Sequence, residues 1–441
     1  MLYYEHMKPT SNPQEMLVTF LKKKGTGQTM GKHLSEDECL MLDALFRSTE
    51  THMVTKATLL TAMLTLTPNE YEAEWINRVR ENPSAIIPDP LIALLPSIPS
   101  EDKFIQLIHN VINHIDLEEM ACLEALEYIF NPKVPDYYKA AFLEAERLKR
   151  ESDIENVTCL LDFVNRSSRH RLDLPLLIDL AYPYDGFNRT PNLSPFLAAL
   201  LSSIGIRVIL HGIKDIGPKY GITPLKIITA QNPNFNLTLP DIITRIQNDQ
   251  CGWSYIDQSA TFPSLYHLKD CRKYMVKRPI ISTIEKLLCP IYSNYNHIIV
   301  TGFTHPPYRQ KMIHLFKHHP LIKTGIIIRG MEGSPQLPLD RRSPFILVND
   351  QNSTESFMCP TTFNIPRSSD SFPANLTAEE TLKIGINALK GEKGWARDQL
   401  IYQALAITDA LSIKRTDDAL SALCLSIETG MAYFHWKIGT E

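Results

Sequence analysis

Glycine is scarce in this sequence, at 18 of 441 residues, or about 4% against roughly 7% in average proteins. Because glycine lets a bare backbone approach a phosphate closely, few loops of the chain can hold a phosphate in that way. Long apolar runs are also lacking, and even residues 196–210 are interrupted by Ser202, Ser203 and Arg207, so no membrane-spanning helix is expected. The first residues have neither the basic nor the apolar part of a signal peptide, which favours a cytoplasmic protein without a membrane partner.

Paired cysteines are absent as well. The eight cysteines include no Cys-x-x-Cys pair and no histidine at metal-ligand spacing, a pattern typical of reduced thiols in a cytosolic protein. Apolar residues make up 44% of the chain and charged residues 21%, so the chain is neither disordered nor a coiled coil. Its length is enough for two or three domains.

No strong net charge points to a partner, because the formal charge is only −4. The distribution is uneven, however, since residues 267–347 contain 13 Lys and Arg against 4 Asp and Glu, a local charge of +9. A basic stretch in an acidic protein suits an anionic ligand or a nucleic-acid backbone better than a membrane surface. An ordinary solvated basic face is an equally good explanation of the same residues.

Two stretches within the first 175 residues look like copies of one helical unit. His33–Glu36 corresponds to His114–Leu117, about 80 residues later, and each begins a helix with an apolar stripe. Each stretch then leads through a short polar turn to a second apolar helix, at 55–66 and at 137–148. The Pro-rich segment 82–100 is the expected linker between the two copies.

The remainder of the chain alternates strands and helices, which predicts an α/β body with a mostly parallel central sheet and a helical tail. The predicted strands are 176–180, 207–210, 298–300, 325–328 and 344–348. The predicted helices are 195–204, 379–389, 396–411 and 417–427. We therefore divide the chain into an extra helical unit with its linker (1–100), a second helical domain (101–175), and the α/β domain with its tail (176–441).

Polar loops follow three of these strands, where ligands of open α/β sheets bind. Residues 181–190 contain a carboxylate, a guanidinium and hydroxyls, and Ser194 is a candidate N-cap, so the next helix could accept an anion. Residues 211–221 hold two lysines and three glycines, which suits a polyanion, and residues 329–334 form the third loop. The alternatives are an ordinary capped helix and, for His211, a hydrogen-bonded structural histidine.

The order and spacing of these loops resemble one enzyme family. His211-Gly212, with a glycine nine residues further on, resembles the Lys-His-Gly-Asn-Arg…Gly loop of anthranilate phosphoribosyltransferases. Asn192–Pro195 resembles the family's Asn-Ile-Ser-Thr phosphate-binding turn, and Asp185-Gly186 matches the end of its Gly-Thr-Gly-Gly-Asp-Gly loop. Residues 391–398, Gly-Glu-Lys-Gly-Trp-Ala-Arg-Asp, resemble its Gly-Glu-x-Gly-x-x-Arg-Asp segment.

The resemblance runs from Ile105 to the end of the chain. The family that it indicates is the third nucleoside glycosyltransferase family, to which pyrimidine nucleoside phosphorylases also belong. It implies a helical domain followed by an α/β domain, and a homodimer formed through the helical domain. It also implies phosphoribosyl diphosphate or a related phosphosugar as the ligand. The extra helical unit has no counterpart in the ordinary enzyme.

The departures from the family pattern fall on positions that bind the ligand. Residues 181–184, Ala-Tyr-Pro-Tyr, stand where the family has Gly-Thr-Gly-Gly, and Pro183 also removes a backbone donor. The family's magnesium-binding Asp-Glu pair aligns with Pro335 and Gln336. Magnesium is a possible cofactor, but it would lack its usual carboxylates, and no metal ligand is assigned.

Two functions remain open at this point. The first is a pentosyltransferase acting on a phosphorylated ribose donor, for which no catalytic residue is assigned, because such enzymes stabilise an oxocarbenium-like centre by charge placement. The second is a non-catalytic nucleic-acid-binding paralogue on the same fold, for which Arg278 with Thr283…Cys289-Pro290 is the nearest match. The residues expected to bind the ligand are Asp185, Gly186, Asn188, Arg189, Asn192, Ser194, His211, Gly212, Lys214, Lys219 and Arg278.

Overall fold

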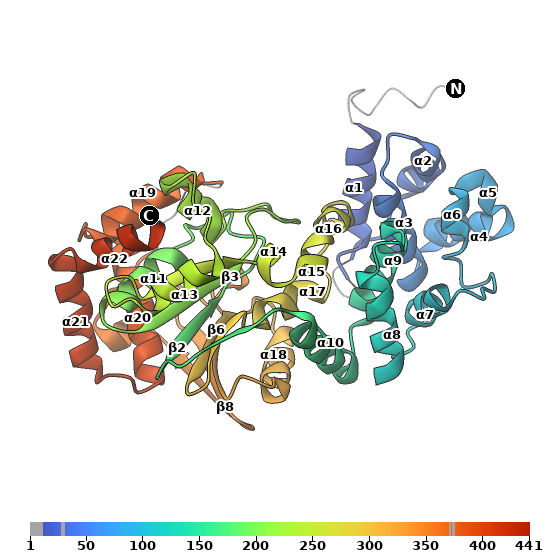
Figure 1. The fold of residues 1–441 in the computed structure, drawn as a ribbon. Helices are drawn as coiled ribbons and strands as arrows, with labels where there is room; N and C mark the ends of the chain where they lie inside the picture. The colour runs from blue at the N-terminus through green and yellow to red at the C-terminus, as the bar shows by residue number, and fades with distance from the viewer. Residues whose placement is uncertain (1–11, 28–30, 370–371, 373–374) are drawn as a thin grey trace. The chain divides into compact units, whose positions relative to one another are not determined.

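The computed structural model describes residues 12–27, 31–369, 372 and 375–441, and the chain forms two compact units (Figure 1). The first unit runs to Cys159 and also includes His267–Ile281, whereas the second contains Leu160–Tyr266 and Ser282–Glu441. Residues 267–281, which the sequence assigns to the α/β domain, therefore belong to the helical unit. Within the described residues, no helix is both long enough and apolar enough to span a membrane.

The helical unit contains α1 (Pro13–Lys24), α2 (Glu36–Arg47), α3 (Met53–Thr65), α4 (Glu70–Glu81), α5 (Pro83–Ile86), α6 (Asp89–Ile92), α7 (Lys103–Ile112), α8 (Glu119–Phe130), α9 (Asp136–Lys149) and α16 (Lys269–Met275). Helix α10 (Asp153–Arg166) begins in this unit and ends in the second. The expected linker 82–100 holds the two short helices α5 and α6, and its Leu91, Leu94 and Leu95 are buried. This segment therefore packs as part of the unit.

Three consecutive helices of the helical unit recur at a constant distance in the sequence. The first residues of α2 and α8, of α3 and α9, and of α4 and α10 are each 83 positions apart: Glu36 and Glu119, Met53 and Asp136, Glu70 and Asp153. The duplication predicted from the sequence is therefore confirmed. The residue matching is corrected, because an offset of 83 pairs His33–Glu36 with Asp116–Glu119 rather than with His114–Leu117.

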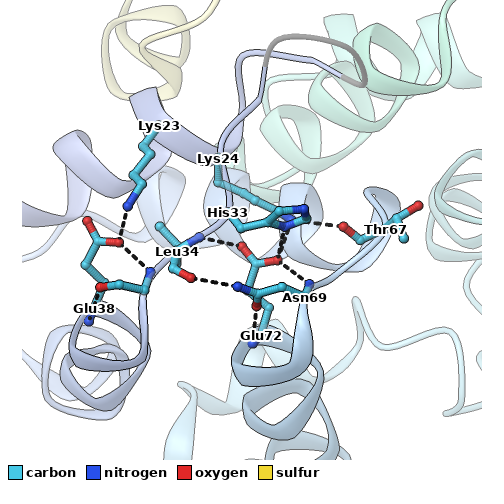
Figure 2. A network of polar contacts seen from close by, with 9 residues as sticks. Lys23, Lys24, His33, Leu34, Glu38, Thr67, Asn69 and Glu72 are labelled. Carbon is cyan, nitrogen blue, oxygen red and sulfur yellow. Dashed lines mark hydrogen bonds and ion pairs between the residues drawn. The ribbon is translucent and has the colours of Figure 1, made fainter.

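In the first copy, one buried carboxylate connects three segments of chain (Figure 2). The fully buried side chain of Glu72, in the first turn of α4, forms an ion pair with Lys24 of α1 at 2.7 Å. Its oxygens also accept the backbone N–H groups of Leu34 at 2.8 Å and of Asn69 at 2.9 Å. The Asn69 contact completes a capping box, and the Leu34 contact fixes the chain just before α2.

The second copy repeats this arrangement with a different lysine. Glu155 accepts the backbone N–H groups of Leu117 at 2.7 Å and of Ser152 at 2.6 Å, and it pairs with Lys149 at 2.7 Å. The lysine comes from α9 here and from α1 in the first copy. Both copies thus use a buried, lysine-paired glutamate to hold the start of a helix.

The second unit is built on a seven-stranded sheet in the order β4-β3-β2-β6-β7-β8-β9. The strands from β4 to β7 in this order are parallel, and β8 and β9 are antiparallel to their preceding neighbours. A separate parallel pair is formed by β1 and β5. The strands are β1 (His170–Leu172), β2 (Leu177–Ala181), β3 (Arg207–Gly212), β4 (Trp253–Asp257), β5 (Ile291–Ser293), β6 (His297–Gly302), β7 (Thr324–Ile328), β8 (Ser343–Asn349) and β9 (Asn352–Met358).

Helices cover both faces of this sheet (Figure 1). On one face, Ile178 and Leu180 of β2 pack in a large apolar core that also contains residues of α11 and α20–α22. On the other face, Leu177 and Ile209 pack against Ile242 of α13. The helices wholly or mainly in this unit are α11 (Ser194–Ser203), α12 (Pro224–Gln231), α13 (Leu239–Gln247), α14 (Gln258–Thr261), α15 (Pro263–His267), α17 (Ile281–Ile284), α18 (Pro307–His318), α19 (Ala378–Leu389), α20 (Trp395–Ala410), α21 (Thr416–Glu428) and α22 (Met431–Thr440).

The predicted mostly parallel α/β architecture is confirmed, with one strand direction wrong. Residues 344–348 lie in β8, which is antiparallel to β7 rather than parallel. The physical reason is the connection 329–342, which contains a 3₁₀ turn but no crossover helix, so the chain turns back beside β7. The ranges predicted from the sequence do not include β1, β4, β5 and β9, nor the helices α12–α15, α17, α18 and α22.

Candidate anion-binding site

Three loops of the second unit meet at the carboxyl ends of β2, β3 and β7. The first and second loops are joined by a bridge between Phe187 and Ile222 and by a hydrogen bond of 2.9 Å from the Gly221 N–H to the Asp185 carbonyl. Gly186 permits this approach, because its φ is +72° and a Cβ there would lie 2.6 Å from the Gly221 carbonyl carbon. The third loop reaches the first through the side chain of Glu332.

The carboxylate of Glu332 lies in a nest of backbone donors. It accepts the N–H groups of three consecutive residues: Asn188 at 3.1 Å, Arg189 at 2.8 Å and Thr190 at 3.2 Å. Lys219 of the second loop places its ammonium 2.9 Å from the same carboxylate. Successive N–H groups with a nearby lysine are the donor set that binds phosphates. We call Asn188–Thr190 with Lys219 the anion nest.

Electrostatics favour an ionised Glu332 in this position. Burial by itself would raise the pKa of the carboxyl, but the Lys219 ammonium and the backbone donors outweigh burial, and the pKa lies below its ordinary value. Glu332 also has a φ of +53°, a left-handed conformation that side-chain-bearing residues adopt rarely. The chain thus places one of its own carboxylates against the three backbone donors and the lysine.

The turn that resembles the family's phosphate-binding motif is closed on itself. The Asn192 side-chain oxygen accepts the Ser194 N–H at 3.1 Å and the Ser194 hydroxyl at 2.7 Å, and both side chains are fully buried. Gln336 fills the same turn, because its carboxamide accepts the Leu193 N–H and donates to the Pro191 carbonyl, both at 3.0 Å. The expected hydroxyl cap is wrong, since α11 begins at Ser194 itself and has no side-chain cap.

The residues present do not fit the magnesium ion that the family resemblance implies. Pro335 offers no ligand side chain, and the buried carboxamide of Gln336 is committed to two backbone groups. Glu332 is committed to the anion nest. Asp340 is exposed and pairs with the neighbouring Arg341 at 2.8 Å. Residues 335 and 336 therefore provide no carboxylate pair for a magnesium ion.

His211 and Gly212, the last two residues of β3, are buried beside the first loop. The His211 Nδ1 lies 2.5 Å from the Tyr184 hydroxyl, and its Nε2 lies 2.9 Å from the Asp179 carboxylate. Burial raises the pKa of the Tyr184 hydroxyl well above its ordinary value, so this group stays neutral. His211 is thus held by the Tyr184 hydroxyl on one side and by an ion-pair contact with Asp179 on the other, as a structural histidine would be.

The other residues predicted to bind the ligand do not all lie at the anion nest. Lys214 is exposed, and its carbonyl accepts the Thr223 hydroxyl at 2.9 Å. Arg278 belongs to the helical unit and not to the unit that contains the anion nest. Asp185 is buried and contributes its carbonyl to the second loop. Of the predicted set, the structure brings together Gly186, Asn188, Arg189 and Lys219, all of which contact Glu332 or its partners.

The occupant of the nest was missed by the sequence reasoning. The third loop was predicted to be polar and near the site, but no role was given to Glu332. A signal was present, because Glu332 is one of only four acidic residues between 267 and 347. A carboxylate that follows the end of a buried strand, in a stretch with few acidic residues, is a natural partner for the cations expected there.

No protein-family model matches the chain. An uncharacterized protein of Aquifex aeolicus is 28% identical over 245 residues, which are 55% of this chain and 71% of that protein. An anthranilate phosphoribosyltransferase of Legionella pneumophila is 23% identical over 331 residues, which are 74% of this chain and 92% of that enzyme.

Solved structures of anthranilate phosphoribosyltransferases also match this chain in fold. The anthranilate phosphoribosyltransferase of Thermus thermophilus matches with a TM-score of 0.61 and 19% identity, over 76% of this chain and 98% of that one. The Saccharomyces cerevisiae enzyme in complex with PRPP and Mg matches with a TM-score of 0.62 and 14% identity, over 77% of this chain and 97% of that one. The fold is therefore the one predicted from the loop motifs, and the chain is similar to anthranilate phosphoribosyltransferases in sequence and in fold.

Proposed function

We propose that the anion nest binds the phosphate of a phosphorylated ribose, phosphoribosyl diphosphate or a close relative. The observation that carries the proposal is the convergence of three consecutive backbone N–H groups and the Lys219 ammonium on one anion. The ligand phosphate would take the place of the Glu332 carboxylate, which leaves the nest when its side chain rotates. The likeness to enzymes of this class supports the choice of a phosphosugar over other anions.

The same groups suit pentosyl transfer. Departure of a diphosphate from the ribosyl carbon develops negative charge on the leaving group, and the nest presents fixed positive ends of N–H dipoles and one ammonium there. A side-chain nucleophile is not required, because the oxocarbenium-like centre is stabilised by charge placement. On the acceptor side, Tyr220 of the second loop is an exposed aromatic residue that can stack on a ring.

Calorimetric titration with phosphoribosyl diphosphate tests the proposal. The native protein should bind weakly, Glu332→Ala should bind more tightly, and adding Lys219→Met to Glu332→Ala should abolish the gain. The matched control is Lys214→Met, which removes an exposed lysine of the same loop that lies outside the nest. Chelation of magnesium should change these affinities little, since the usual carboxylates are replaced. Binding that survives Lys219→Met unchanged contradicts the proposal.

Nucleic-acid binding is a second candidate, favoured by one observation. Three arginines of the basic stretch are exposed: Arg329, just after β7, and Arg341 and Arg342, just before β8. Binding of single-stranded DNA through these residues should weaken steeply with salt, with a log–log slope of about −0.7 per phosphate contacted. A salt series with the native protein and an Arg329→Ala, Arg341→Ala, Arg342→Ala variant separates this from phosphosugar binding, which should be unaffected by the triple substitution.

A further inference from the structure

A second group of chemically active side chains is buried in the same unit, on the sheet face opposite the large core. Asp179 lies in the middle of β2 and pairs with Ile299 of β6, so His297, two residues earlier on β6, presents its side chain to the same face. Cys289 lies just before β5. One ligand atom from each of Asp179, Cys289 and His297 lies within 4.8 Å of the others, and all three residues are buried.

Two of these side chains lack the partners that buried polar groups normally have. Within the described residues, neither ring nitrogen of His297 makes a hydrogen bond, although the residue is only 4% exposed. The carboxylate of Asp179, fully buried, accepts no hydrogen bond there and has His211 at 2.9 Å and His297 at 3.8 Å as its ion-pair contacts. Because native proteins satisfy nearly all buried polar groups, this deficit points to a missing ligand.

The neighbouring His319 differs from His297, because both of its ring nitrogens are hydrogen-bonded. It lies 3.9 Å from the Cys289 sulfur, but its Nε2 donates to the Leu287 carbonyl at 2.7 Å and its Nδ1 accepts the Leu321 N–H at 3.1 Å. Both nitrogens of His319 are therefore in use, whereas those of His297 make no hydrogen bond to any residue that the structure describes. The ring of His297, and not that of His319, is available to a ligand of the Asp179–Cys289–His297 group.

We propose that Asp179, Cys289 and His297 bind one zinc ion. A carboxylate, a thiolate and a neutral imidazole are the ligand types that zinc takes together, and the thiolate excludes magnesium and calcium. Zinc with one carboxylate and one thiolate is electrically neutral, which removes the cost of an uncompensated charge in the buried core. The thiol proton is released when the ion binds, and a water molecule completes the coordination.

The distances between the ligand atoms agree with this assignment. Ligand atoms around tetrahedral zinc are about 3.4 Å apart, given metal–ligand bonds of about 2.0–2.3 Å. The observed 3.8 Å between Asp179 Oδ2 and His297 Nε2 is close to this spacing. His211 contacts the other oxygen of Asp179 and orients the carboxylate without itself being a zinc ligand.

Metal analysis of the full-length protein tests the proposal. Cells are grown with added zinc, and the purified native protein should retain one zinc per chain after dialysis. Cys289→Ser and His297→Gln should each reduce the zinc content to background. Cys251→Ser is the matched control, because Cys251 is also a buried cysteine but lies outside the cluster, with its sulfur 3.2 Å from the Trp253 carbonyl. His211→Gln should weaken zinc binding by about 10–100-fold without abolishing it.

A second measurement covers the case in which a ligand variant does not fold. Native protein grown with cobalt in place of zinc should show the intense visible bands of four-coordinate cobalt and a thiolate-to-metal charge-transfer band. Absence of both metals from well-folded native protein refutes the site. Zinc that remains in folded Cys289→Ser and His297→Gln proteins refutes it too, since the metal is then bound elsewhere. Neither result depends on whether the anion nest binds a phosphosugar.

Discussion

Replacing Glu332 by alanine should destabilise the second unit measurably. The substitution removes an acceptor that holds three backbone N–H groups and pairs with Lys219, whose side chain is 17% exposed. Hydrogen bonds to a charged group contribute about 1.5–3 kcal/mol each, and breaking a buried ion pair costs about 3–5 kcal/mol. Because the partly exposed lysine and amides can be rehydrated, we expect a loss of about 2–4 kcal/mol in the free energy of unfolding. That loss corresponds to a fall of about 4–16 °C in melting temperature.

The same variant should become sensitive to anions. An anion that fills the empty nest stabilises the folded state by RT ln(1 + [L]/Kd), or about 2.7 kcal/mol at a ligand concentration of 100 Kd. Thermal melts of Glu332→Ala with phosphoribosyl diphosphate or inorganic phosphate should therefore recover most of the lost stability. Sodium chloride at the same ionic strength should not. The native protein should respond much less, since its own carboxylate already occupies the nest.

The matched control is Asp340→Ala, which removes an exposed carboxylate shortly after the third loop. Asp340 pairs with Arg341 at the surface, where an ion pair contributes about 0–1 kcal/mol. The reasoning is refuted if Glu332→Ala melts at the same temperature as Asp340→Ala and neither responds to phosphate. That result would mean that the nest is a local turn without appreciable affinity for anions.

Three further predictions follow from the described contacts. The native protein should be more stable than Glu332→Gln, and this difference in the free energy of unfolding should be fully present above pH 4.5, the ordinary pKa of the carboxyl group. The difference should vanish as the pH falls through the lower pKa of Glu332 in the folded protein, which thermal melts at acidic pH would show. Glu72→Gln and Glu155→Gln should each lower the free energy of unfolding by about 3–5 kcal/mol, against about 0–1 kcal/mol for the more exposed Glu38→Gln, measured by urea titration. If the extra helical copy replaces a partner's helices, the chain sediments as a monomer of 50.2 kDa, and twice that mass contradicts this.

Much of the architecture could be predicted from the sequence, because periodic apolar residues and capping residues act locally. The capping box of Ser35 and Glu38, the strands of the parallel sheet and the duplicated helices all carry such local signals. The direction of a strand could not be predicted where no crossover helix precedes it, as for β8, which is antiparallel to β7. The grouping of 267–281 with the helical unit depends on contacts between segments far apart in the sequence, which local patterns do not encode.

The candidate site was predictable as three loops but not as a set of contacts. Asn192 and Ser194, which resemble the family's phosphate-binding turn, are hydrogen-bonded to each other, and Gln336 is hydrogen-bonded to the backbone of the same turn. The zinc ligands proposed above are even less visible, since Asp179 and Cys289 are 110 positions apart and meet only because of the strand order. Residue types at a strand end indicate where a ligand could bind, whereas the partners of each side chain decide what is available to bind it.

The internal ion pair has a consequence for any measurement of affinity. If the Glu332 contacts are worth about 2–4 kcal/mol, the nest is open in only about one molecule in 30 to one in 1,000, because 1.4 kcal/mol is a factor of ten. A phosphosugar then binds the native protein about 30–1,000-fold more weakly than it binds an open nest. Weak native binding alone is therefore no sign that the site has lost its ligand. The ratio of affinities between Glu332→Ala and native protein measures the closing contacts directly, and it should match the stability that the same substitution removes.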